Sequence, residues 1–185
     1  MAEPDAAKTL AYDFNGSLWV APVGTALPLK TAFYPVTPPY LPTTPWLNTG
    51  YIDEAGPAFE TKDSITTLRA WQALADVRKV SKGKTTTLAF SLLEWTLSNV
   101  EWSMGLVDDG AGLLMPSSVA VEKAVLIIVT DGANQIGIGF PRASLEVAAK
   151  VTFKPADWAS LPVLLTALQP TTGASFKVYL PATFV

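Results

Sequence analysis

Residues 120–142 read AVEKAVLIIVTDGANQIGIGFPR, and this stretch decides the fold class. The apolar run over residues 124–130 is shorter than the roughly 18 to 20 residues that a membrane-spanning helix requires, so it predicts a buried strand. The run ends at Asp131-Gly132, a dipeptide that favours a tight hairpin turn. The chain then returns through residues 135–142 as a second strand. We therefore expect an antiparallel β-hairpin here.

Alternation of apolar and polar residues predicts further strands around this hairpin. They cover residues 17–21, 66–80, 85–92, 144–154, 163–168 and 176–180. In the first of them, Leu18 and Val20 share one face and Trp19 occupies the other. The inward-facing residues of 85–92 are Leu88, Phe90 and Leu92. The alternation is most regular over residues 144–154, where we expect one continuous strand.

The spacing becomes helical after residue 92. Apolar residues recur at Leu93, Leu97, Val100 and Met104, and the opposite face carries Glu94, Ser98 and Glu101. Gly105 follows at the position of a C-terminal cap. We therefore predict one α-helix over residues 92–104, buried through the apolar set and solvated through the polar set.

Together these elements predict a mainly β protein, an antiparallel β-sandwich or open barrel with one flanking α-helix and a long extended arm. The 185 residues fit a single domain, 1–185, which would bury roughly 70% of its unfolded surface. Hydrophobic residues make up 49% of the chain and charged residues 16%, against about 25% charged residues in ordinary soluble domains. Part of the apolar surface is therefore expected to face other copies.

Two segments interrupt the pattern and are interpreted as arms. Residues 1–15 show no periodicity and predict an N-terminal arm. Residues 22–49 contain seven prolines, which argue against any helix or central strand, and their interspersed aromatic rings need a surface to pack against. This Pro-rich arm either lies over a neighbouring subunit, with Trp19, Tyr34 and Trp46 as contacts, or covers the core of its own chain.

Residues 53–84 predict a long loop or hairpin with a basic tip. Its cations, around Ser81 and Gly83, are Arg78, Lys79, Lys82 and Lys84. They fit either an electrostatic contact with an acidic patch on another subunit or a solvated turn, and binding to DNA phosphates is a less favoured third alternative. Trp71 and these four cations are the candidate contact residues of this segment.

The residue types that most often carry catalysis and metal binding are absent. The chain has no histidine and no cysteine. The acidic pairs Asp53-Glu54 and Asp108-Asp109 lie in turns, where carboxylates usually bond to their own backbone. Gly137-Ile138-Gly139 lacks the third glycine and the following helix of a dinucleotide-binding motif. We therefore predict no catalytic residue, no metal site and no cofactor.

Charge and the N-terminal sequence limit the expected partners. A formal net charge of -3 argues against binding to a phosphate backbone. The first ten residues contain Glu3, Asp5 and Lys8 and lack the basic start and apolar centre of a secretory signal. No continuously apolar stretch is long enough to cross a membrane. We expect synthesis in a cytoplasm and no membrane partner.

Several motifs, in this order, resemble those of the major tail tube proteins of long-tailed bacteriophages. They are GSLWVAPVGTALP at 16–28, GYIDEAG at 50–56, RAW at 69–71, VR at 77–78, LLEW at 92–95, Gly105, and FPRA at 140–143. The resemblance spans roughly residues 16–179. It implies a β-sandwich with a flanking helix that assembles as stacked hexameric rings, through which double-stranded DNA passes.

The resemblance also implies partners and a location. Residues 53–84 occupy the place of a long loop that reaches the next ring, and an acidic lumen would repel the passing DNA instead of binding it. Tape measure, tail terminator and distal tail proteins would complete a tail that is assembled in the host cytoplasm and belongs to the virion. The Pro-rich stretch 35–45 departs from the usual pattern of the family.

A protein of another class also fits the residues. A β-sandwich module that binds a receptor or a carbohydrate would use exposed tryptophans as platforms. Such a module would be a monomer or small oligomer that binds glycan, whereas a tube protein associates with itself into filaments.

Overall fold

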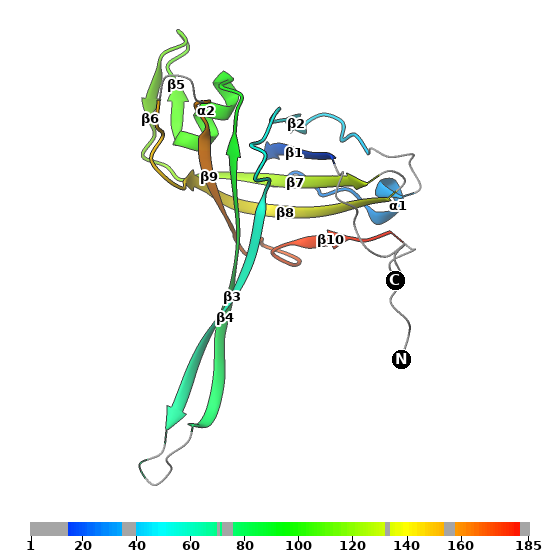
Figure 1. Ribbon diagram of the computed structural model, residues 1–185, viewed down its shortest axis with the longest axis vertical. Helices are drawn as coiled ribbons and strands as arrows, with labels where there is room; N and C mark the ends of the chain where they lie inside the picture. Colours follow the sequence, from blue (N-terminus) through cyan, green and yellow to red (C-terminus); the bar gives the residue numbers. More distant parts are fainter. Residues whose placement is uncertain are drawn as a thin grey trace.

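The described part of the chain forms a mainly β, antiparallel fold (Figure 1). The computed structural model describes residues 15–34, 40–69, 71, 76–131, 134–153 and 158–181. Its strands are β1 (Asn15–Pro22), β2 (Leu47–Asn48), β3 (Ala58–Arg69), β4 (Asp76–Leu92), β5 (Leu106–Asp108), β6 (Leu114–Pro116), β7 (Val121–Asp131), β8 (Asn134–Val147), β9 (Leu161–Ala167) and β10 (Lys177–Tyr179). The helices are α1 (Lys30–Phe33) and α2 (Leu97–Met104). The expected N-terminal arm lies outside the described residues, apart from Asn15 in β1.

One large sheet has the strand order β2-β1-β7-β8-β9-β4-β3, with β10 paired to β8, and β5 and β6 form a separate hairpin. The hairpin predicted from residues 120–142 is confirmed, since β7 pairs with β8 as far as Asp131 opposite Asn134. Pro141 and Arg142 of β8 lie opposite the single Ala124 of β7. This β-bulge allows a proline in a central strand.

Strand β7 is buried on both faces, as its continuous apolar sequence predicts. Val125 and Ile127 join one core cluster, and Ala124, Leu126 and Ile128 join the other. The first cluster also contains the residues of β1 and β4 that were expected to point inward, namely Leu18, Val20, Leu88, Phe90 and Leu92. The sheet therefore needs cover on both of its faces.

Helix α2 lies over the face of the sheet that carries the first core cluster. Identifiable capping residues determine where the helix begins and ends. The Oγ1 atom of Thr96 accepts a hydrogen bond from the backbone N of Asn99 at 3.2 Å, which caps the N-terminus. Gly105 caps the C-terminus with a φ of 64°, as expected. The predicted start at residue 92 was wrong, because Leu92 still pairs in β4 and the chain is not helical before Leu97.

The buried side of α2 also differs from the prediction. It consists of Asn99, Trp102 and Ser103, whereas Leu97 and Met104 are exposed. The Trp102 ring packs 6.5 Å from the Phe90 ring, so one large aromatic residue fixes the rotation of this short helix. The Asn99 amide is satisfied in the interior by two carbonyl oxygens.

The described part of residues 22–49 covers the face of the sheet that carries the second core cluster. This agrees with the interpretation in which the Pro-rich arm covers the core of its own chain. The fully buried Phe33 ring lies 4.9 Å from the Tyr179 ring, centroid to centroid. Gln135 of β8 joins the segment to the sheet, because its Nε2 donates to Phe33 O and its Oε1 accepts from Tyr40 N, both at 2.8 Å. The expectation that this segment contains no helix was wrong. It contains the one-turn helix α1, which lies in a stretch free of proline.

Two glycines of β8 let this segment lie close to the sheet. A Cβ atom at Gly137 would lie 2.7 Å from Phe33 Cζ, and one at Gly139 would lie 2.9 Å from Leu27 Cδ2. Real Cβ atoms essentially never come this close to a neighbour. The Gly-Ile-Gly sequence therefore serves packing.

We expect Gly137→Ala to lower the free energy of unfolding by about 1–3 kcal/mol, because the buried Phe33 ring has no space into which to move. Urea denaturation followed by tryptophan fluorescence measures this change. The control is Gly83→Ala in β4, where an added Cβ meets nothing within 4 Å. Equal stability of the two variants would contradict the packing role.

The long strand expected over residues 144–154 is only partly present. β8 ends at Val147, and the next backbone N, that of Ala148, donates to Pro162 O at 3.0 Å. The chain then leaves the sheet: Val151 packs against the first core cluster, and Phe153 lies against Trp95. The apolar and polar residues alternate beyond the end of β8 because Val151 and Phe153 make apolar contacts even though they lie outside a strand.

Candidate functional site

The most distinctive feature is the two-stranded ribbon formed by residues 60–69 of β3 and 76–84 of β4, which projects from the sheet (Figure 1). β3 and β4 pair from Ala58 opposite Ala89 to Arg69 opposite Asp76, but β9 pairs with β4 only over residues 87–92. At about 3.3 Å per residue, residues 61–69 reach roughly 30 Å beyond the sheet. An isolated two-stranded hairpin is at best marginally stable in water. We therefore expect the ribbon to be stabilised by packing against a surface outside the sheet.

The cations of the ribbon lie along β4, which corrects the expected basic tip. Because Ser64 pairs with Gly83 and Ile65 pairs with Ser81, Lys82 is the extra residue of a β-bulge within a continuous strand. Ser81 and Gly83 suggested a turn, but β4 already begins at Asp76 and runs through both residues. The basic residues thus line the length of the ribbon.

Exposed apolar side chains accompany these charges. Ile65, Leu68 and Val80 are exposed on the ribbon, and Trp71, beyond the end of β3, has 98% of its surface accessible. Ion pairs link Lys62 to Glu60 at 2.9 Å and Lys84 to Asp63 at 3.7 Å. Six basic residues, Lys62, Arg69, Arg78, Lys79, Lys82 and Lys84, outnumber three acidic ones, Glu60, Asp63 and Asp76. The ribbon is therefore a positively charged surface with apolar residues towards its end.

The three candidate contacts at β1 and in the Pro-rich arm belong to the second core face of the chain itself. Trp46 keeps only 8% of its surface accessible, and Trp19 is half-buried with its Nε1 donating to Ser17 Oγ at 3.0 Å. The Tyr34 hydroxyl donates to Gln135 O at 2.7 Å, and burial raises its pKa to about 12. The structure does not bring these residues together with the ribbon.

Of the acidic pairs singled out from the sequence, Asp53, Asp108 and Asp109 accept hydrogen bonds from backbone N–H groups. A further carboxylate, not singled out from the sequence, bonds to an arginine. Asp109 Oδ1 accepts from the backbone N of Ala111 and Leu113, and these bonds lower its pKa. Glu122 and Arg142 form a two-bond pair across β7 and β8 at 2.7 and 2.9 Å, which lowers the pKa of Glu122. Within the described ranges, no group of three or more potential ligands gathers to hold a metal ion.

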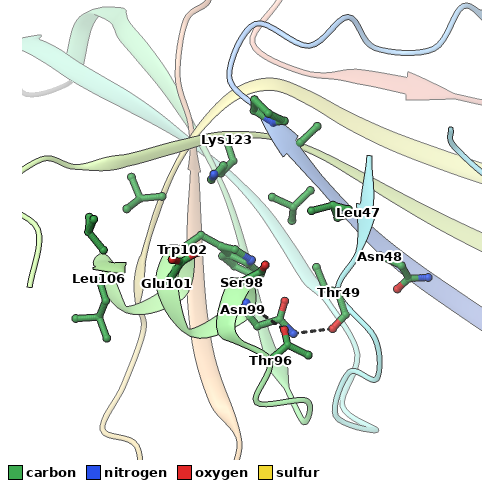
Figure 2. Close-up of a pocket in the computed structure, with 15 residues that line it drawn as sticks. Leu47, Asn48, Thr49, Thr96, Ser98, Asn99, Glu101, Trp102, Leu106 and Lys123 are labelled. Carbon is green, nitrogen blue, oxygen red and sulfur yellow. Dashed lines mark hydrogen bonds between the residues drawn. The ribbon is translucent and has the colours of Figure 1, made fainter. Parts of the chain in front are cut away.

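A cavity of about 590 Å³, here called the α2 cavity, opens between α2, β1, β2, β5 and β7 (Figure 2). Its apolar lining includes Val20, Leu47, Trp102, Leu106, Val107 and Val121. Ser98 and Glu101 of α2 and Lys123 of β7 add polar groups. The Asn99 Nδ2 atom donates to Thr49 O at 2.9 Å and joins α2 to the segment after β2. A cavity of this size accommodates a large side chain or a small ligand.

The cavity opens on an acidic, apolar surface, here called the α2 face and formed by residues 93–119. This segment carries Glu94, Glu101, Asp108 and Asp109 and no lysine or arginine. Its exposed apolar residues are Trp95, Leu97, Met104, Val107, Leu113, Met115 and Val119. A patch of this kind marks an interaction surface. Along the long axis of the molecule, the α2 face lies at the opposite end from the ribbon (Figure 1).

Comparison with known families identifies the kind of protein. A family model described as phage tail tube protein matches residues 5–183. The chain belongs to this family. No curated protein matches it. This tail tube protein is thus a structural component of a phage tail, and its antiparallel sheet with a flanking helix is the fold that the sequence resemblance implied.

Sequence reasoning located the ribbon of this tail tube protein but missed the α2 cavity. The cavity is assembled from β1, β2 and β7 together with the consecutive α2 and β5, which come from separate parts of the chain, so no local pattern reveals it. One signal was available for the α2 face, namely four acidic residues and no basic one over residues 93–119. Among the residues placed by the structure, no helix has the length and apolar character needed to span a membrane.

Proposed function

We propose that this tail tube protein polymerises as stacked hexameric rings, which enclose the channel for double-stranded DNA during genome ejection, and that it catalyses no reaction. The ribbon is the observation that carries the proposal. It extends roughly 30 Å from the sheet, and among the described residues no third strand lies beside it, which suits a contact with another copy. Trp71, Arg78, Lys79, Lys82 and Lys84 are the proposed contact residues between rings.

Open sheet edges support contacts within a ring. β2 pairs only with Trp19 and Val20 of β1, and β3 ends the sheet on the other side. Exposed edges readily pair with another chain, and a closed ring of identical copies satisfies them. We propose that such pairing joins the six copies around the channel.

The charge of the chain suits a passage for DNA. A net charge of -3 favours repulsion of the phosphate backbone and thus transit without specific binding. The tape measure, tail terminator and distal tail proteins are the proposed partners at the ends and in the interior of the tube. Assembly would take place in the cytoplasm of the bacterial host.

Electron microscopy of the concentrated, purified protein tests this function. We expect hollow filaments with a regular ring repeat and six-fold symmetry in end-on views. Dispersed monomers that bind a glycan in a saturable manner would instead support the receptor- or carbohydrate-binding module. Filaments without a central channel would contradict the role in DNA passage.

A further inference from the structure

We propose that the ribbon of one copy docks on the α2 face of a second copy, with the Trp71 side chain entering the α2 cavity. The proposal rests on the proposed stacking of copies and names the surface that receives the ribbon. The ribbon contributes an exposed apolar end and a row of cations, and the α2 face contributes a cavity and acidic groups.

The positions of the two surfaces determine the kind of contact. The ribbon and the α2 face lie at opposite ends of the long axis, so the ribbon does not reach the α2 face of its own chain (Figure 1). A surface at one end that fits a different surface at the other end gives a head-to-tail contact, which repeats from copy to copy. The occupant of the α2 cavity is therefore a second copy of this chain.

The charges of the two surfaces are complementary. Residues 60–84 carry an excess of three positive charges, and residues 93–119 carry four negative charges and no positive one. Lys123 of β7 also lines the α2 cavity, so the α2 face and the cavity together carry a net charge of -3. Arg78 and Lys79 lie on β4 towards the end of the ribbon, and Glu101 lines the α2 cavity. Opposite charges across an interface orient the partners and select against wrong pairings.

The shapes and chemistry of the two surfaces also match. Tryptophan is among the residues that most often act as anchors in pockets at protein interfaces, and Trp71 is almost fully accessible. The α2 cavity offers apolar walls for the indole ring. Hydroxyl and carboxylate oxygens of Ser98 and Glu101 are acceptors for the indole N–H, which requires a partner when buried.

Cross-linking tests the contact directly, because the chain has no cysteine of its own. Leu68→Cys places a thiol on the ribbon near Trp71, and Val107→Cys places one at the α2 cavity, where valine is 54% exposed. In filaments of this double variant, a short bifunctional maleimide is expected to yield a ladder of covalent oligomers. The control pairs Leu68→Cys with Val178→Cys in β10, which is 48% exposed and distant from the α2 face. That pair is expected to yield no ladder.

Reversing charges on the two surfaces tests the same contact through its effect on filament assembly. Glu101→Lys is expected to raise the critical concentration for filament formation at least about tenfold, since like charges would then face each other. Adding Arg78→Glu and Lys79→Glu to the same chain is expected to restore assembly, because position 101 then faces opposite charges again. Glu146→Lys on β8, outside the α2 face, is the control for an added positive charge and is expected to assemble normally.

The outcomes separate this inference from the proposed function. Filaments that cross-link through Val107→Cys and recover with the reversed charges support both. Filaments that cross-link only through Val178→Cys, or that gain nothing from the triple reversal, overturn the docking on the α2 face and leave the tube intact. A wild-type protein that forms no filaments under any condition removes the tube and the docking together.

Discussion

Replacing residues 64–83 with a two-residue Asn-Gly turn is expected to abolish filament formation and to leave a folded monomer. Asp63 and Lys84 form a cross-strand pair, and a two-residue turn of this type joins such a pair without distortion. Those of the removed residues whose side chains the structure describes belong to neither core cluster. Negative-stain microscopy measures assembly, and thermal unfolding measures the fold, with Tm expected within about 5 °C of the wild type.

This result requires that the ribbon serve assembly alone. A large fall in Tm would show that the ribbon supports the fold, and filaments at the wild-type concentration would show that it is not needed between rings. Trp71→Ala within the full-length ribbon is the milder companion variant. It removes the apolar anchor, retains all the charges and is expected to weaken assembly without abolishing the fold.

The elements predicted from sequence are those whose signal is local. The unbroken apolar run of β7 indicated a strand buried on two faces, and the alternation of Leu88, Phe90 and Leu92 gave the inward side of β4. Gly105 marked the end of α2 because a left-handed cap strongly favours glycine. These features depend on a few neighbouring residues, so one sequence is sufficient to find them.

The features that sequence reasoning got wrong or left open depend on distant contacts. The buried side of α2 follows from Trp102 meeting Phe90, and the Pro-rich arm lies over its own sheet because Gln135 and Tyr179 hold it there. Neither contact leaves a periodic pattern in the chain. Contact of Trp19, Tyr34 and Trp46 with another copy stays a prediction, since aromatic rings among prolines indicate a partner surface but not which one it is.

Phe33→Ala is expected to have the largest effect on the stability of the monomer, lowering the free energy of unfolding by about 3–5 kcal/mol. The Phe33 ring is fully buried and contacts the rings of Tyr34, Tyr40 and Tyr179, so its removal leaves a cavity between the Pro-rich arm and β8. Urea denaturation measures the loss. Phe153→Ala is the matched control, since Phe153 is 71% exposed, and we expect it to cost about 0.5 kcal/mol or less.

A double-mutant cycle with Gly137→Ala shows whether the predicted loss arises from this contact. In the wild-type background the added Cβ would meet the Phe33 ring at 2.7 Å, but in the Phe33→Ala background only the contact with Tyr179 Cδ2 at 3.0 Å remains. The cost of Gly137→Ala is therefore expected to fall from about 1–3 kcal/mol to less than about half of its wild-type value, since residues in direct contact are not additive. Strictly additive losses would mean that the two residues act independently, and the close approach of the Pro-rich arm to β8 would then not explain the stability of this face.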